Sequence, residues 1–383
     1  MDAPASLTPR RARIGFIDAA RSFAIFGAVY CHVVLAMGVW GQIDNEVVKA
    51  VGNLLFRTCA PVFFILTGVL FELVYVRKAA KEGFAPVARR LSIRALQCYA
   101  GYAVGLLAAL ISGRLDQHGF GLALISAGPA PMIGVLWFYC VFMFAAIPLI
   151  AMRLRWGPWC LLLVLAGIWL LDPVLAAWLG GGPPTDAWSF FLGKQFGHPA
   201  ITLPGTGQAV WHSLTLVVFG MVLGHAMLRS QEATGNPLSN RFIWTSIGCC
   251  ILGAAAFAYL LGVHSLIYGF LATSMPLRMG NHPAYYLLTI PVALAMLTLF
   301  RWLHRDDQLR KPWFDPALVL GRRGLLAFTI GNAGVNLIPK GFDPALILGL
   351  GLSLLFMVVF VVVLRLLPGD RTAPSARPAA TSA

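Results

Sequence analysis

The chain has 383 residues, of which 58% are hydrophobic and only 11% are charged, whereas a soluble globular domain carries about 25% charged residues. This composition argues against a water-soluble globular protein, and apolar runs of about 20 residues, the length that crosses a bilayer, recur along the whole chain. The formal net charge of +14 does not indicate nucleic-acid binding, because the lysines and arginines lie in short segments between the apolar runs.

The apolar runs predict an all-α polytopic membrane protein, a bundle of about ten transmembrane helices. In chain order they cover residues 15–40, 51–76, 95–112, 132–152, 157–179, 209–228, 242–263, 285–303, 317–339 and 344–367. Residues 1–13 are expected to form a cytoplasmic N-terminal segment, and residues 14–367 the transmembrane domain. Residues 368–383 read as a disordered cytoplasmic tail.

The basic residues predict the orientation of the bundle. With the N-terminus in the cytoplasm, 22 of the 29 lysines and arginines fall on the cytoplasmic side and five on the other side, while Arg21 and Arg57 lie within helices. This asymmetry follows the positive-inside rule and places both termini in the cytoplasm. The seven cysteines lie in apolar stretches without CxxC or Cys/His spacing, so no metal site is expected.

The first run carries three ionisable side chains, Asp18, Arg21 and His32, and such groups are costly inside a membrane. In a helix, the eleven-residue step from Arg21 to His32 ends about 20° beyond three full turns. Both side chains therefore share one face, about 16 Å apart along the axis, and Asp18 lies one turn from Arg21.

This stripe allows two interpretations. A buried neutral histidine can accept the proton of a hydroxyl that attacks a carbonyl, and a guanidinium suits phosphate, so the stripe fits a reaction between a phosphorylated donor and an acceptor deeper in the membrane. A structural ion pair between Asp18 and Arg21, with His32 bonded to a neighbouring helix, fits the spacing equally well.

Two segments have the form of family motifs. The first helix has an arginine followed after ten residues by a histidine, in Ile17-Asp18-Ala19-Ala20-Arg21, Ala24-Ile25, Val29 and His32. The second run begins with Arg57-Thr58-Cys59-Ala60-Pro61-Val62-Phe63-Phe64-Ile65-Leu66-Thr67-Gly68. Together these segments resemble the opening of membrane acyltransferase family 3.

Weaker matches to the same family follow along the chain. They are the basic run Arg89-Arg90-Leu91-Ser92-Ile93-Arg94, the segment Leu136-Trp137-Phe138-Tyr139, the pair Phe219-Gly220 with Gly224, and Leu320-Gly321-Arg322. The sequence departs from the family at Ser22 (usually glycine), at Thr67 (usually serine), and at Thr329-Ile330-Gly331-Asn332, where many members place a histidine.

The resemblance implies an integral membrane O-acyltransferase of the bacterial inner membrane. It would move an acyl group, acetyl or succinyl, from cytoplasmic acyl-coenzyme A to a hydroxyl of a cell-surface or periplasmic glycan, with no tightly bound cofactor. The catalytic residues would be His32 as general base, Arg21 as a group that holds the donor or orients the site, and Asp18 in the same stripe. Candidate substrate-binding residues are Arg57, Trp137, Tyr139, Arg90 and Arg94.

Several of these side chains have a structural alternative. Arg57 fits a structural ion pair as well as a binding role, and Trp137 and Tyr139 are of a type that more often packs between membrane helices. For Asn332 a bond between helices is favoured over an oxyanion contact. Glu72 is expected to pair with Arg77 or another basic loop residue.

The alternative function is a transporter or flippase, in which Asp18, Arg21 and His32 would form a proton or substrate path. Inverted repeats would favour it, and the sequence shows none. The expected partners are acyl-coenzyme A, a glycan acceptor and the lipid bilayer, without nucleic acid, and a homo-oligomer is compatible with the sequence.

Overall fold

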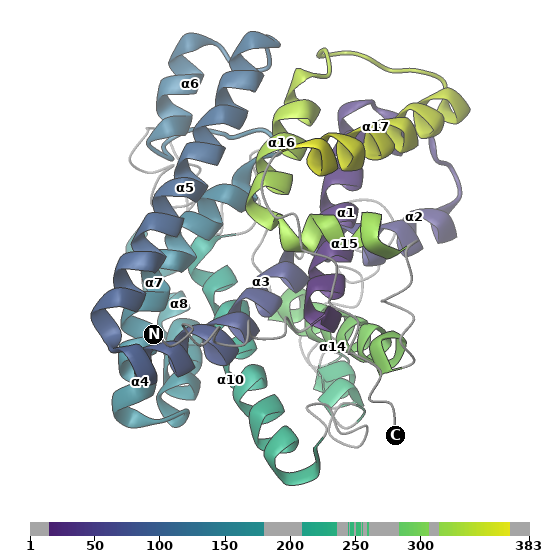
Figure 1. The fold of residues 1–383 in the computed structure, drawn as a ribbon. Helices are drawn as coiled ribbons and strands as arrows, with labels where there is room; N and C mark the ends of the chain where they lie inside the picture. The colour runs from purple at the N-terminus through teal and green to yellow at the C-terminus, as the bar shows by residue number, and fades with distance from the viewer. Residues whose placement is uncertain are drawn as a thin grey trace, which may run out of the picture.

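The computed structural model describes residues 15–179, 209–235, 283–305 and 314–367, together with short pieces between residues 244 and 259. Every secondary-structure element in these ranges is a helix, which confirms the predicted all-α class (Figure 1). The segments predicted at residues 1–13 and 368–383, and most of the span predicted at 242–263, lie outside the described residues.

The helices follow one another through the bundle shown in Figure 1. They are α1 (Gly15–Ala36), η1 (Val39–Gln42), α2 (Glu46–Gly52), η2 (Asn53–Arg57), α3 (Cys59–Leu70), η3 (Phe71–Val76), α4 (Arg77–Glu82), α5 (Phe84–Ile111), α6 (Gln117–Leu124), α7 (Gly134–Trp156), α8 (Trp159–Leu179), α10 (Val210–Thr234), α14 (Pro283–Arg305), α15 (Asp315–Arg322), α16 (Gly324–Leu337) and α17 (Leu346–Leu366).

The described helices have the lengths that a polytopic membrane protein requires. Seven of them are long and apolar enough to cross a membrane, among them the continuous helical stretch Glu46–Glu82. Two shorter apolar helices, Trp159–Leu171 and Gly324–Leu337, accompany them. The chain is therefore a multi-pass, all-α membrane protein.

Helix α3 lies at the centre of the bundle, with nearly all of its side chains buried against α1, α10 and α14. Its closest neighbour is α10, because Gly68 and Gly220 bring the two backbones together and a Cβ atom on either would overlap a backbone carbonyl of the other helix. Gly224 continues this contact one turn further along α10. Small residues four apart are a common device for close helix packing in membranes, where apolar burial alone does not hold helices together.

The predicted continuous helix at 317–339 is wrong, because the chain breaks between α15 and α16 at Arg323. Helix α1 packs into this break: the Gly321 N–H donates to Ser22 Oγ (2.7 Å), and a Cβ atom on Gly321 would overlap the carbonyl of Asp18. Arg323 donates to the carbonyls of Leu364 and Leu367 at the end of α17. Ser22 thus accepts from a backbone amide beside the break, while Arg323 satisfies carbonyls at the C-terminal end of α17.

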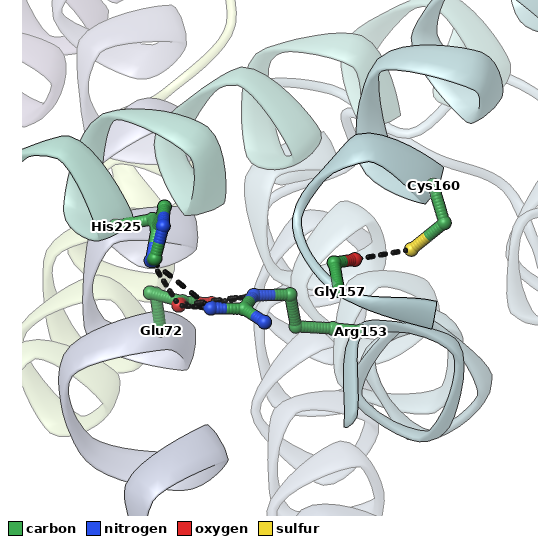
Figure 2. A network of polar contacts seen from close by, with 5 residues as sticks. All are labelled: Glu72, Arg153, Gly157, Cys160 and His225. Carbon is green, nitrogen blue, oxygen red and sulfur yellow. Dashed lines mark hydrogen bonds and ion pairs between the residues drawn. The ribbon is translucent and has the colours of Figure 1, made fainter. Parts of the chain in front are cut away.

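A buried ion pair joins three helices where η3 follows α3 (Figure 2). Arg153 of α7 donates to the carboxylate of Glu72 at 2.7–3.2 Å and to Nδ1 of His225 on α10 at 3.0 Å. Glu72 was expected to pair with Arg77 or another basic loop residue; its partner is indeed basic, but it is Arg153, which lies within the last turns of α7 rather than in a loop. His225, to which the sequence assigned no role, completes the network.

We expect Glu72→Ala to destabilise the bundle by about 3 kcal/mol, because removing one partner of a buried ion pair leaves the other charge uncompensated. The Glu72 side chain is 1% exposed. Glu82→Ala is the matched control: the Glu82 side chain is 48% exposed and lies 3.6 Å from Lys78 and Arg90. The control should cost less than about 1 kcal/mol. Thermal unfolding of the purified protein in detergent measures both, and equal shifts would contradict the structural role of Glu72.

Candidate active site

A cavity of about 690 Å³ opens between α1, α3, η3, α5, α7 and α16, a size that suits a small-molecule ligand. Its wall is mostly apolar, with a few polar and cationic side chains. The lining residues are Arg21, Phe63, Thr67, Leu70, Phe71, Tyr75, Arg94, Gln97, Cys98, Ala100, Gly101, Val104, Leu136, Tyr139, Met143, Arg322, Arg323, Gly324, Leu325, Leu326, Phe328 and Thr329. We call it the donor cavity, after the role proposed for it below, and its arginine-lined side at Arg94 and Arg322 the mouth.

The mouth of the donor cavity is cationic. Arg94 donates to Oε1 of Gln97 (3.1 Å), while Arg322 is held by Asp315 at 2.6 Å. A smaller cavity of about 340 Å³ shares Tyr75, Arg94 and Gln97 with the donor cavity and adds Lys78 and Arg90. Four basic side chains thus surround the way in, where they favour an anionic ligand.

Aromatic rings line the far end of the donor cavity. The ring of Phe63 lies 4.7 Å from that of Phe328 and stacks on Tyr139 at 4.8 Å, centroid to centroid. The Tyr139 and Thr67 hydroxyls are hydrogen-bonded to each other. These side chains are almost fully buried, so the cavity ends against a packed core.

Arg21 is the cation that lies deepest along this cavity. Its guanidinium lies 5.4 Å from the Phe63 ring centroid and 3.9 Å from the carboxylate of Asp18. The Arg21 Nε is buried without a hydrogen bond, and a Cβ atom on Gly324 would lie 3.0 Å from Arg21 Nη2. The positive end of the α16 dipole therefore adds to the charge of Arg21, and both favour an anion in the cavity.

His32 lies outside the donor cavity, on the other side of its aromatic end. Its Nδ1 is 3.3 Å from Oδ1 of Asn332. A neutral His32 with its proton on Nδ1 would donate to this amide oxygen and keep the lone pair on Nε2. Asn332 lies one turn beyond Phe328 on α16, about 6 Å along the axis. The helix-to-helix bond favoured for Asn332 is confirmed, and its partner is the predicted base.

The remaining predicted site residues are more dispersed. Tyr139 and Arg94 line the donor cavity together with Arg21, and Arg90 lines the adjoining one. Arg57 lies over the ring of Trp40 at 5.2 Å, away from both cavities. Trp137 contacts Tyr99 and Tyr102 and does not line the donor cavity, as expected of a packing residue.

Sequence reasoning missed several residues that build the site. Arg322 and Gln97 at the mouth and Phe328 at the far end were not singled out for a role, although Arg322 lies in a segment that resembles the family. Phe63 lies in the second family motif and was read there only as part of the pattern. The break before α16, which a continuous apolar run conceals, lies between Arg322 and the α16 residues that line the cavity.

Comparison with known families agrees with this geometry. The family described as an acyltransferase domain matches residues 14–365, which is nearly the whole chain. The chain therefore belongs to membrane acyltransferase family 3 and is a membrane acyltransferase. Neither a curated protein nor a solved structure gives a significant match.

Proposed function

We propose that this acyltransferase moves a short acyl group from cytoplasmic acyl-coenzyme A to a hydroxyl of a cell-surface or periplasmic glycan. The observation that carries the proposal is the donor cavity itself. It has a cationic mouth, an apolar wall and an aromatic far end that adjoins the His32–Asn332 pair. This order matches the order of groups in an acyl-coenzyme A molecule, from nucleotide to thioester.

The proposal places the mouth of the donor cavity on the cytoplasmic side of a bacterial inner membrane. Arg94 and Arg322, which line the mouth, belong to the basic segments that the positive-inside rule assigns to the cytoplasm. Acyl-coenzyme A is a cytoplasmic metabolite, so this orientation lets the donor enter without crossing the bilayer. His32 then lies toward the opposite face, from which a glycan would approach.

The donor would bind with its phosphates at the mouth. Arg94, Lys78 and Arg90 offer charged hydrogen-bond donors there, and Arg94 has no acidic partner among the described residues. Arg21 and the N-terminal amides of α16 line the wall further in, where they can hold a phosphate or the amide carbonyls of the pantetheine arm. Asp18 would keep the Arg21 side chain directed along this wall.

In the transfer step, Nε2 of His32 accepts the proton of the acceptor hydroxyl as its oxygen attacks the thioester carbonyl. The new ester C–O bond forms, the C–S bond breaks, and the coenzyme A thiolate takes the proton from the imidazolium. Asn332 is a positioning residue that holds His32 in the required tautomer. Arg21 lies about 16 Å from His32 along α1, so the two act on different parts of the donor.

A transporter is the second candidate, because the break between α15 and α16 lines a cavity, as broken helices do in many transporters. The family match favours the enzyme. Release of free thiol from acyl-coenzyme A in the presence of acceptor distinguishes the two, since a transporter leaves the thioester intact.

We expect His32→Ala to reduce acyl transfer by about a hundredfold or more, the usual range for loss of a general base. The measurement is transfer of label from radiolabelled acetyl-coenzyme A to the glycan fraction of the source cells, catalysed by purified protein. His118→Ala, which changes an exposed histidine on α6, is the matched control and should leave the rate unchanged. A His32→Ala variant that is folded and transfers normally would refute the assigned base.

We expect Arg94→Ala to weaken acetyl-coenzyme A binding by about tenfold, since one hydrogen bond to a charged group contributes roughly 1.5–3 kcal/mol. The loss should shrink at high salt, where phosphate contacts are screened. Arg155→Ala, an exposed arginine at the end of α7, is the control. Calorimetric titration at two salt concentrations measures both variants, and an unchanged affinity of Arg94→Ala would place the donor elsewhere.

A further inference from the structure

The far end of the donor cavity is closed by a small group of packed side chains. The fully buried side chains there, Phe63 (1% exposed), Phe328 (2%) and Leu136 (1%), come from three different helices. The rings of Phe63 and Phe328 are in contact, with their centroids 4.7 Å apart and their planes tilted by 54°. We call these three side chains the floor of the cavity.

The depth of the cavity follows from the helix register. On α5 its lining runs from Arg94 at the mouth to Val104, which is about 15 Å at 1.5 Å per residue. On α7 it runs from Met143 to the floor residue Leu136, which is about 10 Å. The pantetheine arm of coenzyme A has about twelve bonds between its phosphate oxygen and its sulfur. At roughly 1.2 Å per bond of an extended chain, it spans about 15 Å.

The arm is about as long as the lining on α5, so a donor with its phosphates at the mouth can reach the floor with its sulfur. The acyl group then lies against Phe63 and Phe328, about one helical turn from Asn332 and its partner His32. Packed cores accommodate added methylenes poorly, because each displaces side chains that already fill the space.

We infer that Phe63 and Phe328 determine which acyl group this protein accepts, and that they select acetyl over longer unbranched chains. The inference rests on the proposed function and narrows its donor to the shortest acyl-coenzyme A. It assigns a specificity role to two aromatic side chains that neither touch the acceptor nor move a proton.

The test compares the dissociation constants of acetyl- and butyryl-coenzyme A, with free coenzyme A as reference, for the full-length protein in detergent. The unchanged protein should bind acetyl-coenzyme A about tenfold more tightly than butyryl-coenzyme A. Phe63→Leu and Phe328→Leu should reduce this preference severalfold, since each removes ring volume from the floor. Phe64→Leu is the matched control: it changes the adjacent buried ring, which packs on Phe138 and Phe142 and does not line the cavity.

A second variant tests the inference by adding side-chain volume to the cavity wall instead of removing it from the buried core. Val104 is 49% exposed and lines the cavity about one turn from Gly101, the residue of α5 that faces Leu136, so Val104→Phe reduces the available space while the core stays intact. It should weaken butyryl- more than acetyl-coenzyme A and leave free coenzyme A unaffected.

Each outcome decides something different. If the unchanged protein binds butyryl- as tightly as acetyl-coenzyme A, or if both floor variants bind but keep the original preference, the inference is overturned while the proposed donor stands. If neither thioester nor free coenzyme A binds, the proposed function itself fails, and the inference fails with it.

Discussion

The cost of placing charge inside an apolar bundle organises this structure. The buried charge of Glu72 is fully compensated, because its carboxylate is paired with the guanidinium of Arg153 and both groups contact His225. The charge of Arg21 is only partly compensated, by Asp18 at 3.9 Å and by the face of the Phe63 ring next to its guanidinium. The Glu72–Arg153–His225 network holds helices together, whereas Arg21 leaves positive charge at the wall of a cavity. A cation held in this way is suited to receive an anionic ligand.

The break between α15 and α16 connects that charge to the rest of the fold. A continuous helix at this point would keep its amides bonded within itself, whereas the observed break presents the N-terminus of α16 beside Arg21. The same α16 then carries Phe328 and, one turn further, Asn332. One short helix thus contributes to the wall of the donor cavity, to its floor and to the support of His32. The proposed donor side at Phe328 and the proposed acceptor side at Asn332 are therefore separated by one turn of α16.

The sequence predicted the parts of this account that depend on one segment at a time. Apolar length located the helices of the described ranges, and the helical period placed Arg21 and His32 on one face of α1. It did not predict the break at Arg323, where Gly321 and Gly324 lie against Asp18, Ser22 and Arg21 of α1, because contacts between distant segments cannot be read from one apolar run. Nor could it rank Trp137 against Tyr139, because neighbours on α5 and α3 decide which ring faces the cavity. The sequence shows which residues share one face of a helix, but tertiary packing decides which neighbouring helix or cavity that face contacts.

The proposed mechanism requires the acyl group of the donor and His32 to meet at the Phe63–Phe328 contact. The most direct measurement is an experimental structure of the full-length protein in lipid nanodiscs with acetyl-coenzyme A bound. The account predicts the nucleotide at Arg94 and Arg322, the pantetheine arm along α5, and the acetyl group against Phe328 on the side facing His32. A donor bound outside this cavity, or one whose thioester lies at the mouth beside Arg94, would contradict it.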